Sequence, residues 1–207
     1  MNINLKVLDI SHHNSVDPDG FAKMHDFGVR GIIHKATQGN SYIDPSYARQ
    51  RQMATDAGLL WGAYHFATGD DVDAQVDHFI SVAAPDENTL MALDHEPNGG
   101  NQLDLDGAQA FLESARDKLN RKLVLYSGNL IKEQLTGAND FFAGHRLWLA
   151  QYGPAPHLPA AWSSIWLWQF SDGTINKQGL QVPGISGQVD MNSYGGGDDS
   201  LAAEWAS

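Results

Sequence analysis

The sequence contains no cysteine, which excludes disulfide bonds and thiolate metal sites. Hydrophobic residues make up 42% of the 207 residues, but they form no run long enough to cross a membrane. Basic residues are also scarce, with 13 Lys and Arg against 25 Asp and Glu, which gives a net charge of −12. Nucleic acids and anionic membranes both attract clusters of Lys and Arg, so we expect neither as a partner.

The first residues lack a charged segment followed by an apolar core, so no signal peptide is visible. The length suits one sizeable core and is short for two domains. No linker, low-complexity tract or internal repeat divides the chain. We therefore expect residues 1–207 to form a single domain.

Short apolar runs typical of strands are spaced along the whole chain. They lie at residues 6–11, 30–36, 59–66, 89–96, 122–127, 146–151, 164–170 and 187–194. Helical patterns separate the earlier runs, at residues 18–26, 45–57, 73–83, 105–119 and 129–135. Beyond these helices, the connecting segments hold Pro, Gly and Trp and show little helical periodicity.

Alternating strands and helices predict a parallel sheet, and eight strands in one domain predict closure into a barrel. The predicted fold is therefore α/β, an irregular (β/α) barrel of eight strands with about five helical crossovers. An open doubly wound sheet is the alternative. No Gly-rich phosphate loop follows the first strand, which counts against that alternative.

The strand at 89–96 ends in the sequence Leu-Asp-His-Glu and stops at Pro97. Side-chain alternation places Asp94 and Glu96 on one face and His95 on the other, with the two acidic Cα atoms roughly 6–7 Å apart. Crowded carboxylates raise one another's pKa, and a pair with separated pKa values suits glycoside hydrolysis. Taken alone, the two acids also fit a helix cap or an ion pair with Lys or Arg.

Active sites of such barrels lie at the carboxyl ends of the strands. Nearly every predicted strand places an acid, an aromatic residue or an amide there. The residues are Asp9, Ser11, His12, His13, Asn14, His34, Lys35, Tyr64, His65, Phe66, Asp94, Glu96, Tyr126, Trp148, Gln151, Tyr152, Trp168, Gln169, Asp190 and Asn192. This convergence predicts a functional site at that rim.

Motifs along nearly the whole chain resemble, in order, those of glycoside hydrolase family 25, the Chalaropsis-type lysozymes or N-acetylmuramidases. They are Val-Leu-Asp-Ile-Ser-His-His-Asn (7–14), Gly-Ile-Ile-His-Lys-Ala-Thr-Gln-Gly (31–39), Gly-Ala-Tyr-His-Phe (62–66), Leu-Asp-His-Glu (93–96), Leu-Tyr-Ser-Gly (125–128), Leu-Trp-Leu-Ala-Gln-Tyr (147–152), Leu-Trp-Gln-Phe (167–170) and Val-Asp-Met-Asn (189–192). One position departs from the pattern, because Gln38 stands where members often carry Glu.

The resemblance implies hydrolysis, with retention, of the β-1,4 bond between N-acetylmuramic acid and N-acetylglucosamine in peptidoglycan. It implies an irregular β/α barrel and four acidic positions, at Asp9, Asp94, Glu96 and Asp190. We expect the protein to be a monomer that needs no cofactor and acts on the cell wall outside the cytoplasm, whether secreted, released by a phage or injected.

Glu96 is then the general acid/base, and Asp94 acts either as the nucleophile or as the anion that stabilises an oxazolinium ion formed by the substrate's N-acetyl group. Asp9 and Asp190 become neighbours when the barrel closes, and we expect them to orient Asp94 and tune Glu96. The expected substrate-binding residues are Tyr64, Tyr126, Trp148, Trp168 and Gln169. For Trp148, burial in the barrel wall is an equally good interpretation.

Two other classes of protein fit parts of the pattern. A metal-dependent deacetylase-like barrel would use the histidines near the strand ends, yet His95 lies on the opposite strand face from the acids. A non-catalytic glycan-binding barrel would have lost its acids, and all four are present. We assign no metal ligand, and we expect Lys35 to pair with the rim carboxylates, which would raise its pKa.

Overall fold

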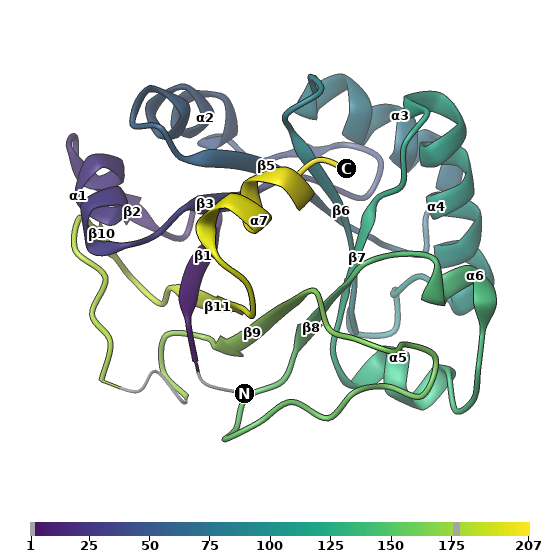
Figure 1. The fold of residues 1–207 in the computed structure, drawn as a ribbon. Coiled ribbons are helices and arrows are strands. Elements are labelled where there is room, and N and C mark those ends of the chain that lie inside the picture. The colour runs from purple at the N-terminus through teal and green to yellow at the C-terminus, as the bar shows by residue number, and fades with distance from the viewer. Residues whose placement is uncertain (1–2, 176–178) are drawn as a thin grey trace.

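Eight strands close into a barrel in the computed structural model, which describes residues 3–175 and 179–207 (Figure 1). Around the barrel the strands are β1 (Leu5–Ile10), β3 (Gly31–Gln38), β5 (Leu60–Phe66), β6 (Leu90–His95), β7 (Val124–Ser127), β8 (Leu147–Ala150), β9 (Leu167–Ser171) and β11 (Asp190–Tyr194). β11 pairs with β1 and closes the circle. The prediction of eight strands in an α/β barrel is confirmed.

The direction of the last strand differs from the expected parallel sheet. Within the barrel, the seven strands β1, β3, β5, β6, β7, β8 and β9 run parallel to one another, whereas β11 runs antiparallel to both β9 and β1. A parallel neighbour needs a crossover back to the same end of the sheet, usually a helix, and the described part of the connection between β9 and β11 contains none. β11 therefore starts at the end where β9 stops, and its first residue, Asp190, lies opposite Asp9.

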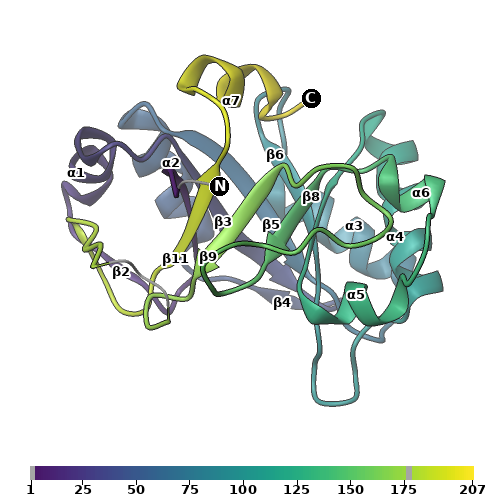
Figure 2. The same cartoon turned by 60° about the horizontal axis from the view of Figure 1, so that its bottom comes forward.

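The five predicted crossover helices are confirmed. They are α1 (Gly20–Phe27), α2 (Tyr47–Asp56), α3 (Val72–Ala83), α4 (Leu105–Leu119) and α5 (Asn129–Gln134). They lie on two sides of the barrel, with α1 and α2 on one side and α3, α4 and α5 on the other (Figure 2). Side-chain caps fix some of the starts: the Asp104 carboxylate accepts a hydrogen bond from the backbone N–H of Gly107 at 2.7 Å. None of the helices in the described chain has the length and apolar character needed to span a membrane.

Several short elements, of two to seven residues, were not predicted. β2 (Ser15–Val16) pairs with β10 (Ile185–Ser186), and β4 (Tyr42–Ile43) adds to the edge of β3. α6 (Asp140–Ala143) precedes β8, and α7 (Asp198–Glu204) follows β11.

The core has two layers that follow the alternation of each strand. On β6, Leu90 and Ala92 point into the barrel, whereas Met91 and Leu93 pack in the outer layer beneath the helices. At the end of the barrel opposite the carboxyl ends of the parallel strands, the Trp205 indole Nε1 donates to the Trp61 carbonyl at 2.7 Å. The inner layer therefore fills the lower barrel and leaves room only near the opposite rim.

Gly31 at the start of β3 lies directly against the Trp205 ring. A Cβ atom at Gly31 would lie 2.5 Å from Trp205 Cη2, so we expect Gly31→Ala to lower the free energy of unfolding by about 1–3 kcal/mol through overpacking. Gly137→Ala is the matched control, because a Cβ atom there meets no atom within 4 Å. Urea unfolding measures both, and equal stability of the two variants would contradict this packing.

Candidate active site

A cavity of about 190 Å³ lies at the carboxyl ends of the parallel strands. It is lined by Asp9, Tyr64, Asp94, Glu96, Tyr126, Trp148, Tyr152, Gln169 and Asp190. An adjoining hollow of about 550 Å³ shares Glu96, Tyr126 and Tyr152 with it. The barrel thus brings together all four acids singled out from the sequence.

Asp94 and Glu96 reach the cavity from the end of β6. Asp94 follows the inward-facing Ala92 and is buried, while Glu96 lies one residue beyond the strand, before Pro97, and is half-buried. The Oδ1 atom of Asp94 has no hydrogen-bond partner in the described chain. Burial, and then the charge of Glu96, hold the pKa of Asp94 well above its ordinary value. A buried acceptor without a donor is costly, so this oxygen is available to a ligand.

Asp9 and Asp190 face each other across the β1–β11 pair. Asp9 accepts hydrogen bonds from Gln169 Nε2 at 3.0 and 3.1 Å and from Asn192 Nδ2 at 2.7 Å. Burial outweighs these bonds and raises the pKa of Asp9 to about 6. Burial and the charge of Asp9 raise the pKa of Asp190 to about 9. The two amide donors favour the charged form of Asp9, so Asp190 is the member of the pair that more readily keeps its proton.

Gln169 connects the acids to the aromatic wall of the cavity. The hydroxyl groups of Tyr126 and Tyr152 each donate to Gln169 Oε1 at 3.0 Å, so the amide nitrogen must face Asp9. The sequence predicts Tyr152 and Asn192 at the rim but indicates no role for either. Asn192 lies two residues after Asp190 on the same strand, so alternation places both side chains on the same face. This spacing is the sequence signal that could have identified Asn192 as a site residue.

The predicted tryptophans occupy two different places. Trp148 is buried in the barrel floor, where its ring meets Tyr126 edge-on at 4.5 Å between centroids and its Nε1 donates to Asn192 Oδ1 at 2.6 Å. Trp168 does not line the cavity, so its expected role in substrate binding is wrong. It points to the outer side of β9, because alternation turns only Leu167 and Gln169 inward, and its Nε1 donates to the Gln151 carbonyl at 2.7 Å.

Lys35 forms no ion pair with the rim carboxylates, which corrects that expectation. Its Nζ donates to Gln38 Oε1 at 2.6 Å and lies 4.7 Å from the centre of the Phe66 ring. Burial lowers the pKa of Lys35, because it outweighs the charges of Asp94, Asp44 and Glu96. The expected rise in its pKa is therefore also wrong.

The histidines near the rim each have a separate partner rather than a shared centre. His12 Nδ1 lies 2.9 Å from Asp44 Oδ2, and His65 bonds Thr37 and Gln75 on the outer side. His95 Nε2 lies 2.8 Å from Gln134 Oε1. Over the described residues, no group of three or more His, Asp or Glu has a geometry that would hold a metal ion.

Comparisons with known proteins agree on one family. A model described as "Glycosyl hydrolases family 25" matches residues 8–179. Lysozyme M1 of Streptomyces globisporus is 28% identical over 213 residues, which cover 95% of this chain and 69% of that protein. The N,O-diacetylmuramidase of Chalaropsis sp is 33% identical over 172 residues, 73% of this chain and 82% of that protein. The solved bacterial lysozyme from Streptomyces coelicolor superposes with a TM-score of 0.86 at 26% identity, covering 100% of this chain and 98% of that one.

The charge of Asp9 acts on both Glu96 and Asp190. Asp9→Asn removes that charge, so we expect the pKa of both carboxyls to fall, and with it the pH at which each loses its proton. Carbon-13 NMR titration of the side-chain carboxyls measures the shifts. Asp140→Asn, on an exposed residue of α6, is the control and should leave the pKa values of Glu96 and Asp190 unchanged. Unchanged pKa values in Asp9→Asn would contradict the coupling.

Proposed function

This chain belongs to the glycosyl hydrolases family 25, and on that premise we propose how its four carboxyl groups cleave peptidoglycan. The protein is a glycoside hydrolase, a muramidase that hydrolyses the β-1,4 bond between N-acetylmuramic acid and N-acetylglucosamine. The observation that supports its mechanism best is the convergence of Asp9, Asp94, Glu96 and Asp190 on one cavity.

Glu96 is the general acid/base in this proposal. It is half-buried and lines both the cavity and the adjoining hollow, so a glycosidic oxygen crossing between the two spaces meets its carboxyl group. Burial and then the charge of Asp9 raise its pKa, which keeps a proton available for the leaving oxygen. After departure of the leaving sugar, the same carboxylate takes a proton from water.

Asp94 stabilises the positive charge that develops on the sugar. Its unpartnered Oδ1 suits the N–H of the substrate's N-acetyl group, whose carbonyl oxygen attacks the anomeric carbon. Tyr64 lines the same cavity and its pKa is raised by burial and by the charge of Asp94, so its hydroxyl keeps its proton and donates to that carbonyl in this mechanism. Retention follows, because water later opens the oxazolinium ion from the side that the leaving group vacated. Direct attack by Asp94 is the alternative.

Asp9 and Asp190 act as positioning residues. Asp9 fixes the Gln169 amide and raises the pKa of Glu96, while protonated Asp190 supplies a donor at the cavity wall for sugar hydroxyls. Gln169 and Tyr126 complete the wall, and Trp148 closes its floor.

The substrate is a polymer, and the hollow beside Glu96 extends the site to further sugars of the strand. We propose that residues 1–207 work as one catalytic barrel domain, as a monomer and without a cofactor. The protein acts on the cell wall. Its place of action is outside the cytoplasm, and its net charge of −12 disfavours nucleic acid and anionic membranes as partners.

The proton donor is tested by Glu96→Gln, which keeps the size of the side chain and removes the proton. We expect the rate of wall hydrolysis to fall by at least about 100-fold, the usual scale of general acid catalysis. Glu87→Gln, the same change at an exposed position, should leave the rate unchanged.

The cleaved bond is identified by mass analysis of the peptidoglycan digest made by the wild-type enzyme. We expect muramic acid at the new reducing ends, and the same products when EDTA is present to remove metal ions. Release of acetate without chain cleavage would instead indicate a deacetylase.

Substrate assistance is tested with peptidoglycan whose muramic acid has lost its acetyl group. We expect hydrolysis of this wall nearly to stop, because the nucleophilic carbonyl is missing, although neighbouring sugars still bind. Asp94→Asn should lower turnover without trapping a covalent intermediate. A glycosyl adduct on Asp94, detected by mass spectrometry with a slow fluorinated substrate, would establish direct attack instead.

A further inference from the structure

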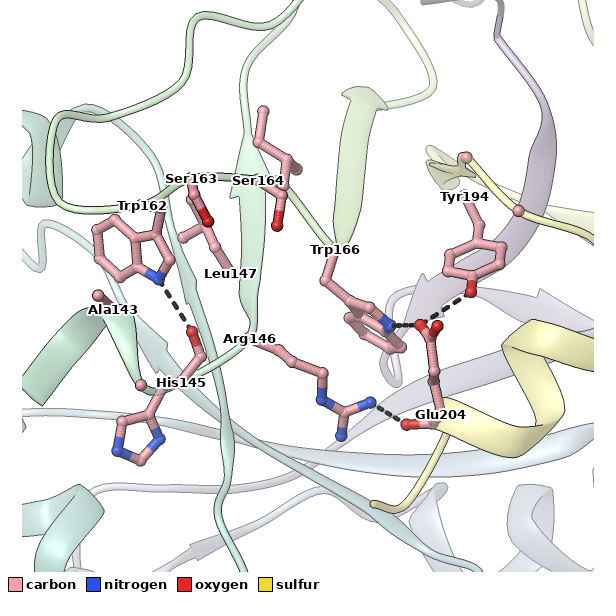
Figure 3. Close-up of a pocket in the computed structure, with 14 residues that line it drawn as sticks. Ala143, His145, Arg146, Leu147, Trp162, Ser163, Ser164, Trp166, Tyr194 and Glu204 are labelled. Carbon is pink, nitrogen blue, oxygen red and sulfur yellow. Dashed lines mark hydrogen bonds between the residues drawn. The ribbon is translucent and has the colours of Figure 1, made fainter. Parts of the chain in front are cut away.

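A second pocket, of about 480 Å³, lies at the end of the barrel opposite the four acids. Figure 3 shows the residues that line it. Strand direction places it there. Leu147 begins β8, Trp166 immediately precedes β9, and Tyr194 ends the antiparallel β11, so these residues share one end of the sheet. Gln169 and Asp190, which line the cavity of the four acids, lie toward the other end of β9 and β11. The two pockets are therefore separated by the filled interior of the barrel.

The wall of this pocket contains a half-buried indole ring held in a fixed orientation. Trp166 Nε1 donates to Glu204 Oε2 at 2.9 Å, and the Tyr194 hydroxyl donates to the same oxygen at 2.8 Å. The Arg146 guanidinium lies over one face of the Trp166 ring, 4.5 Å from its centre, so a ligand can pack only on the exposed remainder of this half-buried ring. Arg146 and Trp166 immediately precede β8 and β9, Tyr194 ends β11, and Glu204 ends α7. The ends of four elements therefore hold the Trp166 ring in place.

Polar groups around the indole remain open to a ligand. Both side-chain bonds to the Glu204 carboxylate reach Oε2, so within the described chain Oε1 accepts no hydrogen bond. The exposed hydroxyls of Ser163 and Ser164 have no partner in the described chain and can donate or accept. A site of this size, with an aromatic surface and a few convergent polar groups, matches the usual make-up of a small-molecule pocket.

The charges argue against an anionic ligand. The terminal nitrogens of Arg146 are used by the backbone carbonyls of Glu204, Trp205 and Ser207. The Glu204 carboxylate and the net charge of −12 repel phosphate or another anion. A wholly apolar ligand would displace the water bound to the carboxylate and the two hydroxyls and would offer them no hydrogen bonds in its place.

A neutral sugar satisfies all of these conditions. Its C–H face packs on an aromatic ring, and its hydroxyl and amide groups donate to a carboxylate and exchange hydrogen bonds with serines. We propose that this pocket is a second glycan-binding site, which takes neutral N-acetylated amino sugars and makes no contact with the reacting bond. The choice of glycan rests on the muramidase function. Two sites on opposite ends of one barrel would keep the enzyme on the wall between cleavage events.

The test uses the full chain carrying Glu96→Gln, so that the probe, a trisaccharide of N-acetylglucosamine, is not cleaved. Nitrogen-15 NMR of the indole N–H groups reports on the two sites separately. Trp166 reports on the second pocket, and Trp148 reports on the floor of the catalytic cavity. Trp166→Phe removes one signal and thereby assigns it to Trp166. We expect the Trp166 signal to shift in a saturable way. A shift of Trp148 alone would overturn the second site and leave the muramidase function intact. Absence of both shifts would also overturn the second site. The muramidase function is tested separately, by the hydrolysis of peptidoglycan.

Blocking the pocket from its rim provides an independent test. Ser164→Trp fills the pocket from an exposed position, and Ser81→Trp, on an exposed residue of α3 outside the pocket, is the matched control. In the Glu96→Gln background we expect Ser164→Trp to weaken sedimentation with insoluble peptidoglycan by roughly tenfold. In the active enzyme, it should slow hydrolysis of insoluble wall and spare short soluble fragments. Equal wall binding by the two Trp variants would overturn the proposal.

Discussion

The crowding of four carboxyl groups in one small, largely buried cavity is the constraint on which the site depends. Each group loses solvation and meets the charge of the others, so the cavity cannot hold four full charges at neutral pH. The structure resolves this by different surroundings: Asp9 receives hydrogen bonds from two amides, whereas burial and the charge of Asp9 raise the pKa of Asp190. Protons are thereby retained in the cavity, as acid catalysis requires.

The amide groups make this division possible, because each is itself held in one orientation. Gln169 receives two tyrosine hydroxyls on its oxygen, and Asn192 receives the Trp148 indole on its own. The amide nitrogens of both side chains therefore face Asp9 and donate to its carboxylate. Loss of one tyrosine hydroxyl would therefore act on Asp9 through an intermediate side chain, and from there on Glu96.

Much of this arrangement follows from the sequence. Side-chain alternation predicts which residues of β6 face the cavity, and the helical spacing of apolar residues predicts the position of α4. Alternation also explains the errors. Trp168 and Gln169 are adjacent on one strand, so only one of them can face the cavity. The reversal of β11 was not predictable from its own residues, because direction is set by the path of the preceding connection. The lowered pKa of Lys35 depends on burial, which residue spacing does not reveal.

The reversal of β11 also decides where the two ends of the described chain emerge. The Asn4 backbone N–H donates to the Ser193 hydroxyl, and α7 follows β11 beneath the barrel, so both ends lie away from the catalytic mouth. A purification tag, fluorophore or immobilising linker attached at either end would leave the entry of a glycan strand unobstructed. On a solid support, such a molecule would present its catalytic mouth outward.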